Sequence, residues 1–454
     1  MIKKTIPIFV ILIIFLFIAF QQTAQADSDT TIKVALYFGE NTKSYYTLES
    51  KIGFYVLNKN GKILTEILSD KIEISTADVS EINSVEIRGD LQISDPIVLP
   101  VSKENPIYFT PIEEDLIILD SSKYRGKILV LPSGGKISII NELNLEEYLY
   151  GVMPMEMPPS WPMEALKAQA VAARTYAVNN LSKWETYGFD LKADTSDQLY
   201  KGYNVEDERT NYAVDQTRGL IATYDGNPIL AMYHSDSGGV TESSENVYET
   251  DIPYLQSVKE LYDVNSPHSN WQVKLSSDKI NEVFKGIKGS IGHINDISIL
   301  ERNSSGRVGK VLLSGTSGEK IISGEELRKI FGLKSTLFDI VGNKTSLDLD
   351  ISILTGNGST HNVSNLKGIQ VFSQGQNRSI KGGGINILGY SKQRTIDDFV
   401  KTSPDSYVVE GRGWGHGIGM NQWGAKAMAE QGHDYINILQ HYYKNIEINQ
   451  YNNK

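Results

Sequence analysis

Short runs of apolar, β-branched and aromatic residues fill the chain from Ile32 to about Leu145, separated by Gly, Asn, Asp, Ser and Pro. Segments of this kind predict short β-strands joined by turns. The sequence Ser133-Gly134-Gly135 lies between two such runs and predicts a hairpin. We therefore expect a β-rich N-terminal region over residues 32–123.

The pattern becomes helical after Ser160. An Ala-rich run from Met163 to Leu181 contains neither Gly nor Pro, which predicts a helix of about five turns. Ser160 is a candidate N-cap for this helix. Glu156 is expected in a proline-rich loop just before the helix begins.

Strand patterns dominate again beyond Asp263, and the chain closes with a strand, a glycine-dense loop and two helical runs split near Gly432. Residues 342–392 are rich in Asn, Ser and Gly and predict an insertion of turns and edge strands. We expect an α+β protein, with a mainly antiparallel mixed domain over 124–454 that contains one long helix.

The first 26 residues have the layout of an export signal. Two lysines precede an apolar run from Ile6 to Phe20, and Ala24-Gln25-Ala26 follows, so cleavage after Ala26 is expected. An uncleaved membrane anchor is the alternative, although fifteen apolar residues fall short of the roughly 20 that span a bilayer. Either reading places the protein outside the cytoplasm, in the wall or at the outer face of the membrane.

Charge and cysteine content exclude several classes of protein. The net charge of −11 becomes −13 without residues 1–26, which carry two lysines and no acids, so nucleic acid is not an expected partner. The chain has no cysteine, which excludes disulfides and thiolate metal ligands. At 454 residues, more than one domain is expected.

Glu156 lies between Met155 and Met157, and a carboxylate among apolar neighbours loses hydration unless a partner or a function offsets the cost. Lys167 and Arg174 are seven residues apart and share one face of the predicted helix. These two cations could bind an anion, or their stems could pack while their charged heads reach water.

Glycines at every second position from 411 to 419 surround Trp414 and His416. The spacing lets backbone approach a ligand or another chain segment closely, so His416 is either a site residue or part of a tight structural loop. A phosphate-binding loop is excluded because no Lys-Ser/Thr follows.

The sequence Asp236-Ser237-Gly238-Gly239 superficially resembles the nucleophile loop of serine proteases, but no histidine precedes His234 to serve as a base. His234 and Asp236 alone do not make a metal site. We expect neither a metal nor a cofactor.

Four segments together resemble the stage II sporulation protein D and amidase-enhancer family of Gram-positive bacteria: YRGKILV, INELNLEEYLYGVMPMEMPPSWPMEALKAQAVAARTYA, YHSDSGGVTE and GRGWGHGIGMNQWGAKAMAEQG. The resemblance implies a lytic transglycosylase that cleaves peptidoglycan strands stripped of stem peptides by a partner amidase. It places the catalytic acid on Glu156 and substrate-binding roles on Lys167, Arg174 and His416.

Two other functions are compatible with these motifs. The chain could bind glycan or an amidase and enhance the amidase without catalysis, or it could be an inactive wall-binding module. Some family members bind zinc through Cys and His near the YHS loop, and the absence of cysteine here argues against a metal.

Overall fold

The computed structural model describes residues 30–77, 83–89, 95–113, 115–248, 250–262, 265–285, 291–342 and 406–452, together with six short strands between 351 and 396. It divides the chain into two compact units. The first unit comprises residues 1–234, 252–264 and 418–454, and the second comprises 235–251 and 265–417. The expected export signal lies outside the described residues. Among the described residues, no helix is long and apolar enough to cross a bilayer.

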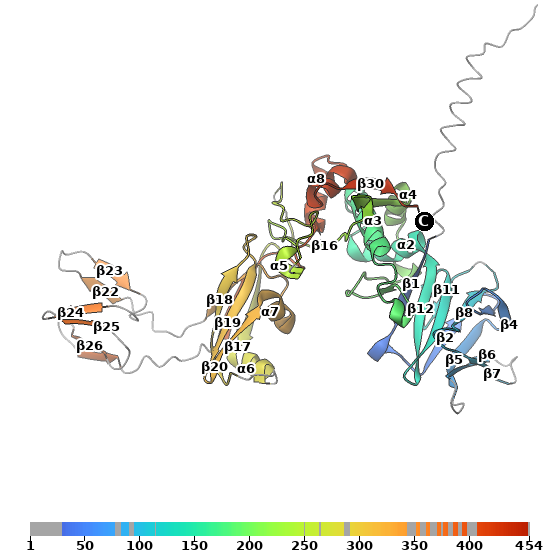
Figure 1. The fold of residues 1–454 in the computed structure, drawn as a ribbon, viewed down its shortest axis with the longest axis horizontal. Helices are drawn as coiled ribbons and strands as arrows, with labels where there is room; N and C mark the ends of the chain where they lie inside the picture. The colour runs from blue at the N-terminus through green and yellow to red at the C-terminus, as the bar shows by residue number, and fades with distance from the viewer. Residues whose placement is uncertain are drawn as a thin grey trace, which may run out of the picture. The chain divides into compact units, whose positions relative to one another are not determined.

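Two sheets build the N-terminal part of the first unit (Figure 1). The seven-stranded sheet has the order β13 (Leu191–Lys192), β1 (Thr31–Tyr37), β12 (Lys136–Asn144), β11 (Lys127–Ser133), β8 (Ile107–Pro111), β3 (Phe54–Leu57) and β4 (Ile63–Ile67). The six-stranded sheet has the order β10 (Ser122–Tyr124), β9 (Ile117–Leu119), β2 (Tyr45–Glu49), β5 (Lys71–Ala77), β6 (Ser84–Gly89) and β7 (Ile97–Pro100).

The predicted hairpin joins β11 to β12. Ser133 pairs with Lys136, and Gly134 and Gly135 have φ of 55° and 79°. Two consecutive left-handed residues are what a two-residue hairpin turn with the right twist requires.

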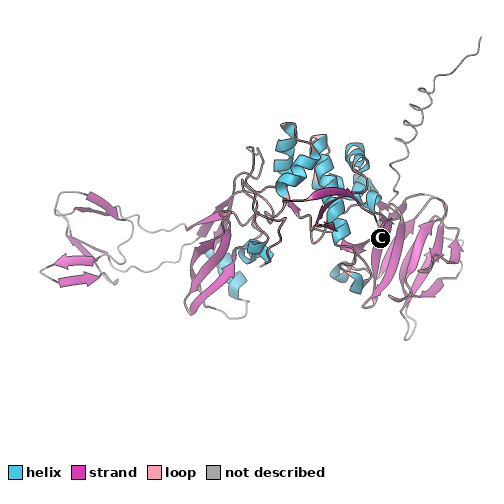
Figure 2. Cartoon of the chain, turned by 45° about the horizontal axis from the view of Figure 1, so that its top comes forward, coloured by secondary structure: helices cyan, strands magenta, loops and turns pink. Residues whose placement is uncertain are grey.

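Helices gather beside one end of β1 and β12 (Figure 2). They are α2 (Leu145–Glu156), α3 (Met163–Asn179), α4 (Glu208–Gln216), α8 (Gln422–Glu430) and α9 (Tyr435–Tyr442). Residues from β1, β12, α2 and α3 share one hydrophobic core. The β-rich region is therefore not separate from the residues after 123, and the structure differs in this respect from the expected boundary. The first unit also contains a three-stranded sheet in the order β15 (Asn227–Pro228), β14 (Leu220–Tyr224) and β30 (Glu447–Gln450).

The second unit has its own core between two three-stranded sheets and their helices. One sheet contains β17 (Trp271–Ser276), β28 (Ser406–Gly411) and β21 (Phe338–Gly342), and the other contains β18 (Ile294–Arg302), β19 (Val308–Gly315) and β20 (Gly318–Ser323). Its helices are α5 (Glu245–Tyr248), α6 (Ser277–Lys285) and α7 (Gly324–Phe331). Within the expected insertion, the described strands form antiparallel pairs: β22 (Ile351–Leu354) with β23 (Thr360–Val363), β24 (Gln370–Ser373) with β25 (Gln376–Ser379), and β26 (Ile385–Leu388) with β27 (Gln393–Ile396). The many strands, most of them in antiparallel sheets, together with the helices confirm the α+β class.

Candidate functional site

Glu156 is the last residue of helix α2, not part of a loop as the sequence predicted. The side chain of Asn144 caps this helix by accepting a hydrogen bond from the Glu146 amide at 2.8 Å. Pro154 lies within the final turn, where the buried apolar face of the helix offsets the missing backbone donor. The helix stops at extended Met157, the residue before Pro158.

One hydrogen bond holds the Glu156 carboxylate: the Leu199 amide donates to Oε1 at 3.4 Å. The polar side chains of Tyr233 and Gln422 face the same carboxylate and favour its charged form. None of these partners is a cation. Of the two flanking methionines, Met157 is fully buried while Met155 is 37% exposed, so the expected apolar flank exists on one side only.

The pKa of Glu156 is raised above its ordinary value of 4.5, and the main cause is burial, which disfavours the charged form. The Leu199 amide and the polar groups of Gln422 and Tyr233 oppose the rise because they stabilise the carboxylate. The position at a helix C-terminus, where the macrodipole is negative, also disfavours the anion. A carboxyl of this kind can hold a proton and donate it.

Tyr233 and Gln422 come from two other sequence blocks. Tyr233 lies on β16 (Tyr233–His234), which pairs in parallel with β29 (Met420–Asn421), and Gln422 begins α8. Gln198 links Tyr233 to Tyr148 of α2, with bonds of 3.0 and 3.1 Å. The fold thus joins the YHS and GMNQW segments to the acid. Sequence reasoning missed these polar partners, although both segments belong to the quoted motifs.

His234 follows Tyr233 and is buried, with Nδ1 3.0 Å from the Ile418 carbonyl oxygen. This contact joins the two motif segments in the first unit. Among the described residues, no group of three His, Cys, Asp or Glu side chains could hold a metal ion.

Lys167 is partly exposed on α3. Its Nζ lies 2.9 Å from Glu164 Oε1, one turn earlier, and 6.0 Å from the centroid of the Tyr435 ring. A partly exposed ammonium paired on its own helix remains available to an incoming anion.

Arg174 is fully buried, which contradicts the predicted role in substrate binding. Its Nε and Nη2 form a fork with the Glu146 carboxylate at 2.8 and 2.6 Å. The remaining N–H groups donate to the carbonyl oxygens of Val214 and Leu220 and the hydroxyl of Thr217. All five guanidinium donors are therefore used. Arg174 is a structural cation that ties α3 to α2 and α4.

His416 is partly exposed and belongs to the second unit, whereas Glu156 belongs to the first. The next residue, Gly417, has φ of 85°, and a Cβ there would lie 2.5 Å from Arg307 Cζ. The alternating glycines therefore allow the backbone to approach another chain segment closely, which is one of the two explanations that the sequence offered for this spacing. The role of His416 itself stays a prediction.

Arg307 was not identified from the sequence. It is buried against Gly417, and its Nη2 donates to the Ser237 carbonyl oxygen at 2.6 Å. Burial lowers the pKa of Arg307 to about 10. The Glu242 amide donates to the Gly417 carbonyl oxygen at 2.7 Å. These contacts fix the backbone on the C-terminal side of His416.

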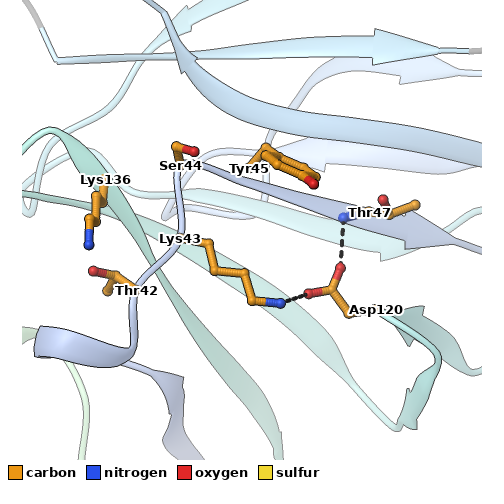
Figure 3. Close-up of a pocket in the computed structure, with 7 residues that line it drawn as sticks. All are labelled: Thr42, Lys43, Ser44, Tyr45, Thr47, Asp120 and Lys136. Carbon is orange, nitrogen blue, oxygen red and sulfur yellow. Dashed lines mark hydrogen bonds and ion pairs between the residues drawn. The ribbon is translucent and has the colours of Figure 1, made fainter.

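A cleft of about 670 Å³ in the first unit contains none of the predicted site residues (Figure 3). Its carboxylate, Asp120, already accepts hydrogen bonds from Lys43 Nζ at 2.7 Å and the Thr47 amide at 3.1 Å. The remaining lining residues are Thr42, Ser44, Tyr45 and Lys136. Because both carboxylate oxygens are engaged, this cleft is a poor candidate for acid catalysis.

Two family models match two different segments of the chain. The family described as Stage II sporulation protein matches residues 133–224, and a domain of unknown function matches residues 241–364. An uncharacterised protein of Brachyspira hyodysenteriae is 28% identical over 88% of this chain and 90% of its own length. The amidase enhancer of Bacillus subtilis is 32% identical over 67% of this chain and 40% of its own length.

The stage II sporulation protein D of Bacillus amyloliquefaciens is 28% identical over 68% of this chain and 76% of its own length. The matched residues 133–224 contain both Glu156 and helix α3. The chain therefore contains a domain of the stage II sporulation protein D family, which confirms the resemblance drawn from its sequence.

Proposed function

We propose that the protein is an exported lytic transglycosylase that cleaves denuded peptidoglycan strands, with Glu156 as both acid and base. The observation that carries the proposal is a buried carboxyl with a raised pKa that is hydrogen-bonded to a backbone amide and whose polar neighbours, Tyr233 and Gln422, are uncharged. Hydrolysis of a glycoside normally takes two carboxylates, whereas intramolecular attack needs only one.

In the first step, protonated Glu156 donates its proton to the glycosidic oxygen as the bond to the anomeric carbon of N-acetylmuramic acid breaks. The leaving sugar departs with a 4-hydroxyl group. The Glu156 carboxylate then accepts the proton of the 6-hydroxyl of the same muramic acid, whose oxygen attacks the anomeric carbon. The product end is a 1,6-anhydro ring, Glu156 is protonated again, and water is not consumed.

The pH dependence should report the acid form of Glu156. We expect the cleavage rate to fall as pH rises through its raised pKa, since the proton donor is then lost. Tyr233→Phe removes a hydroxyl that favours the carboxylate form of Glu156, so the alkaline limb should move to higher pH. The measurement is kcat/KM against pH on denuded strands, with Tyr212→Phe, an exposed tyrosine of α4, as control. A limb that stays in place or moves to lower pH would contradict this assignment.

Lys167 is the proposed receptor for the lactyl carboxylate that denuded muramic acid exposes. Lys167→Ala should weaken binding of denuded strands about tenfold or more, because a charge-assisted hydrogen bond is lost. Lys71→Ala is the control, because Lys71 also pairs with a glutamate, Glu49, at 2.7 Å. Calorimetric titration with denuded strands measures the effect, and equal affinity of a well-folded Lys167→Ala variant would refute the role.

His416 is retained as a proposed substrate-binding residue in the second unit. The proposed location is the cell wall or the outer face of the membrane, because peptidoglycan lies there. The membrane is a partner only if residues 1–26 are retained.

A second function is supported by the relative named amidase enhancer. In that case the protein would bind glycan or a partner amidase and accelerate the amidase without cutting the glycan itself. A protein of this kind would leave purified denuded strands intact and would enhance the amidase equally well with Glu or Gln at position 156.

A further inference from the structure

Trp414 is an exposed aromatic residue in the glycine-dense loop of the second unit. Its side chain is 45% exposed, and no hydrogen bond of its indole N–H occurs within the described part of the chain. A tryptophan with an apolar ring and an available donor suits a ligand that has both apolar and polar faces.

The loop holds Trp414 in a fixed position. Trp414 and Asp236 exchange backbone hydrogen bonds of 2.8 and 3.0 Å. On either side, the Gly413 amide donates to the His268 carbonyl oxygen at 2.9 Å, and the Gly415 amide donates to the Lys334 carbonyl oxygen at 2.8 Å. A loop whose backbone is fixed in this way loses little conformational entropy when its side chain binds a ligand.

The same two residues place polar side chains against the indole. The His268 ring meets it edge-on, with centroids 4.3 Å apart. Lys334 Nζ lies 5.2 Å from the indole centroid, and within the described residues Lys334 has no salt bridge. An exposed aromatic ring thus lies beside an ammonium that pairs with no carboxylate of the described residues.

We propose that Trp414 and Lys334 form a glycan subsite in the second unit, which binds a sugar residue bearing a carboxylate. The apolar C–H face of the pyranose packs on the exposed indole, and the lactyl carboxylate of N-acetylmuramic acid pairs with Lys334. This subsite rests on the proposed function for its substrate. The polar neighbours favour a glycan over a protein partner, since a protein interface centres on a larger apolar patch.

The test uses the full-length protein and two probes: denuded strands with free lactyl carboxylates, and the same strands with these carboxylates converted to amides. Trp414→Ala should weaken binding of both probes about tenfold, whereas Trp414→Phe should largely retain it. Lys334→Gln should weaken binding of the free carboxylate form only. Tyr248→Ala, which removes a 44% exposed aromatic residue of the same unit, is the control.

The outcomes separate this subsite from the proposed catalysis. If Trp414→Ala binds both probes normally, the subsite is refuted, whether or not the protein cleaves glycan. If binding depends on Trp414 while the wild-type protein cleaves nothing, the subsite stands and the proposed reaction fails. Loss of amidase binding with unchanged glycan binding in Trp414→Ala would identify the surface as a protein interface and refute the subsite.

Discussion

Glu156→Gln should abolish glycan cleavage while leaving the fold and glycan binding intact. The amide keeps the size of the side chain but can neither donate a proton as a carboxylic acid nor accept one as a carboxylate. Loss of general acid–base help typically lowers the rate by about 10²–10⁴, and the loss is larger when one group serves both steps. The measurement is the single-turnover rate on purified denuded strands.

Glu147→Gln is the matched control, because Glu147 lies in the first turn of the same helix and pairs only loosely with Arg125, at 3.8 Å. It should retain nearly full activity. A Glu156→Gln variant that cleaves at the wild-type rate would remove Glu156 from the reaction.

Arg174→Ala should destabilise the protein by about 3–5 kcal/mol, the range for breaking one side of a buried ion pair. The reason is that Glu146, which is also fully buried, would lose the guanidinium that it is paired with. Glu146→Ala should destabilise to a similar extent. Arg174→Lys should also lower the stability, because an ammonium cannot replace a guanidinium whose five N–H donors are all engaged.

Urea unfolding followed by circular dichroism measures these free energies. The control is Lys310→Ala, which breaks the exposed pair with Glu301 and should cost no more than about 1 kcal/mol. A stable Arg174→Ala variant that has lost only glycan binding would instead restore the role that the sequence suggested for Arg174.

The sequence pattern predicted the helix and the hairpin whose formation depends on residues close together in the chain. The Ala-rich helix was expected over Met163–Leu181 and is observed at Met163–Asn179. Its expected N-cap, Ser160, was wrong, because Pro162 occupies that position without a side-chain bond. The hairpin at Gly134 and Gly135 follows from the same local chemistry.

Contacts between distant residues could not be read in this way. The spacing of Lys167 and Arg174 correctly places both on α3, but whether either is exposed depends on what packs against each position. Arg174 meets a glutamate 28 residues earlier, and that carboxylate allows its burial. Helix α2 was missed because Pro154 and the two prolines after the helix suggest a loop, while the burial of Leu145 and Tyr148 stabilises a helix.

Domain boundaries were the least accessible feature. The chain leaves the first unit after His234, returns for residues 252–264 and returns again at Ile418. Such a discontinuous path leaves no local signal in composition or periodicity. Because the chain returns to the first unit, Tyr233 and Gln422 lie near Glu156 although both are far from it in the sequence.

The most direct test of a single-acid transglycosylase is the chemistry of the ends that the purified wild-type protein produces. Denuded strands are incubated with the protein alone, and the released fragments are analysed by mass spectrometry before and after borohydride reduction. We expect fragments that end in 1,6-anhydro-N-acetylmuramic acid, are lighter by one water than hydrolysis products, and resist reduction at that end. Fragments with ordinary reducing ends would show that water attacks the anomeric carbon, which would contradict the mechanism and require a second catalytic carboxylate.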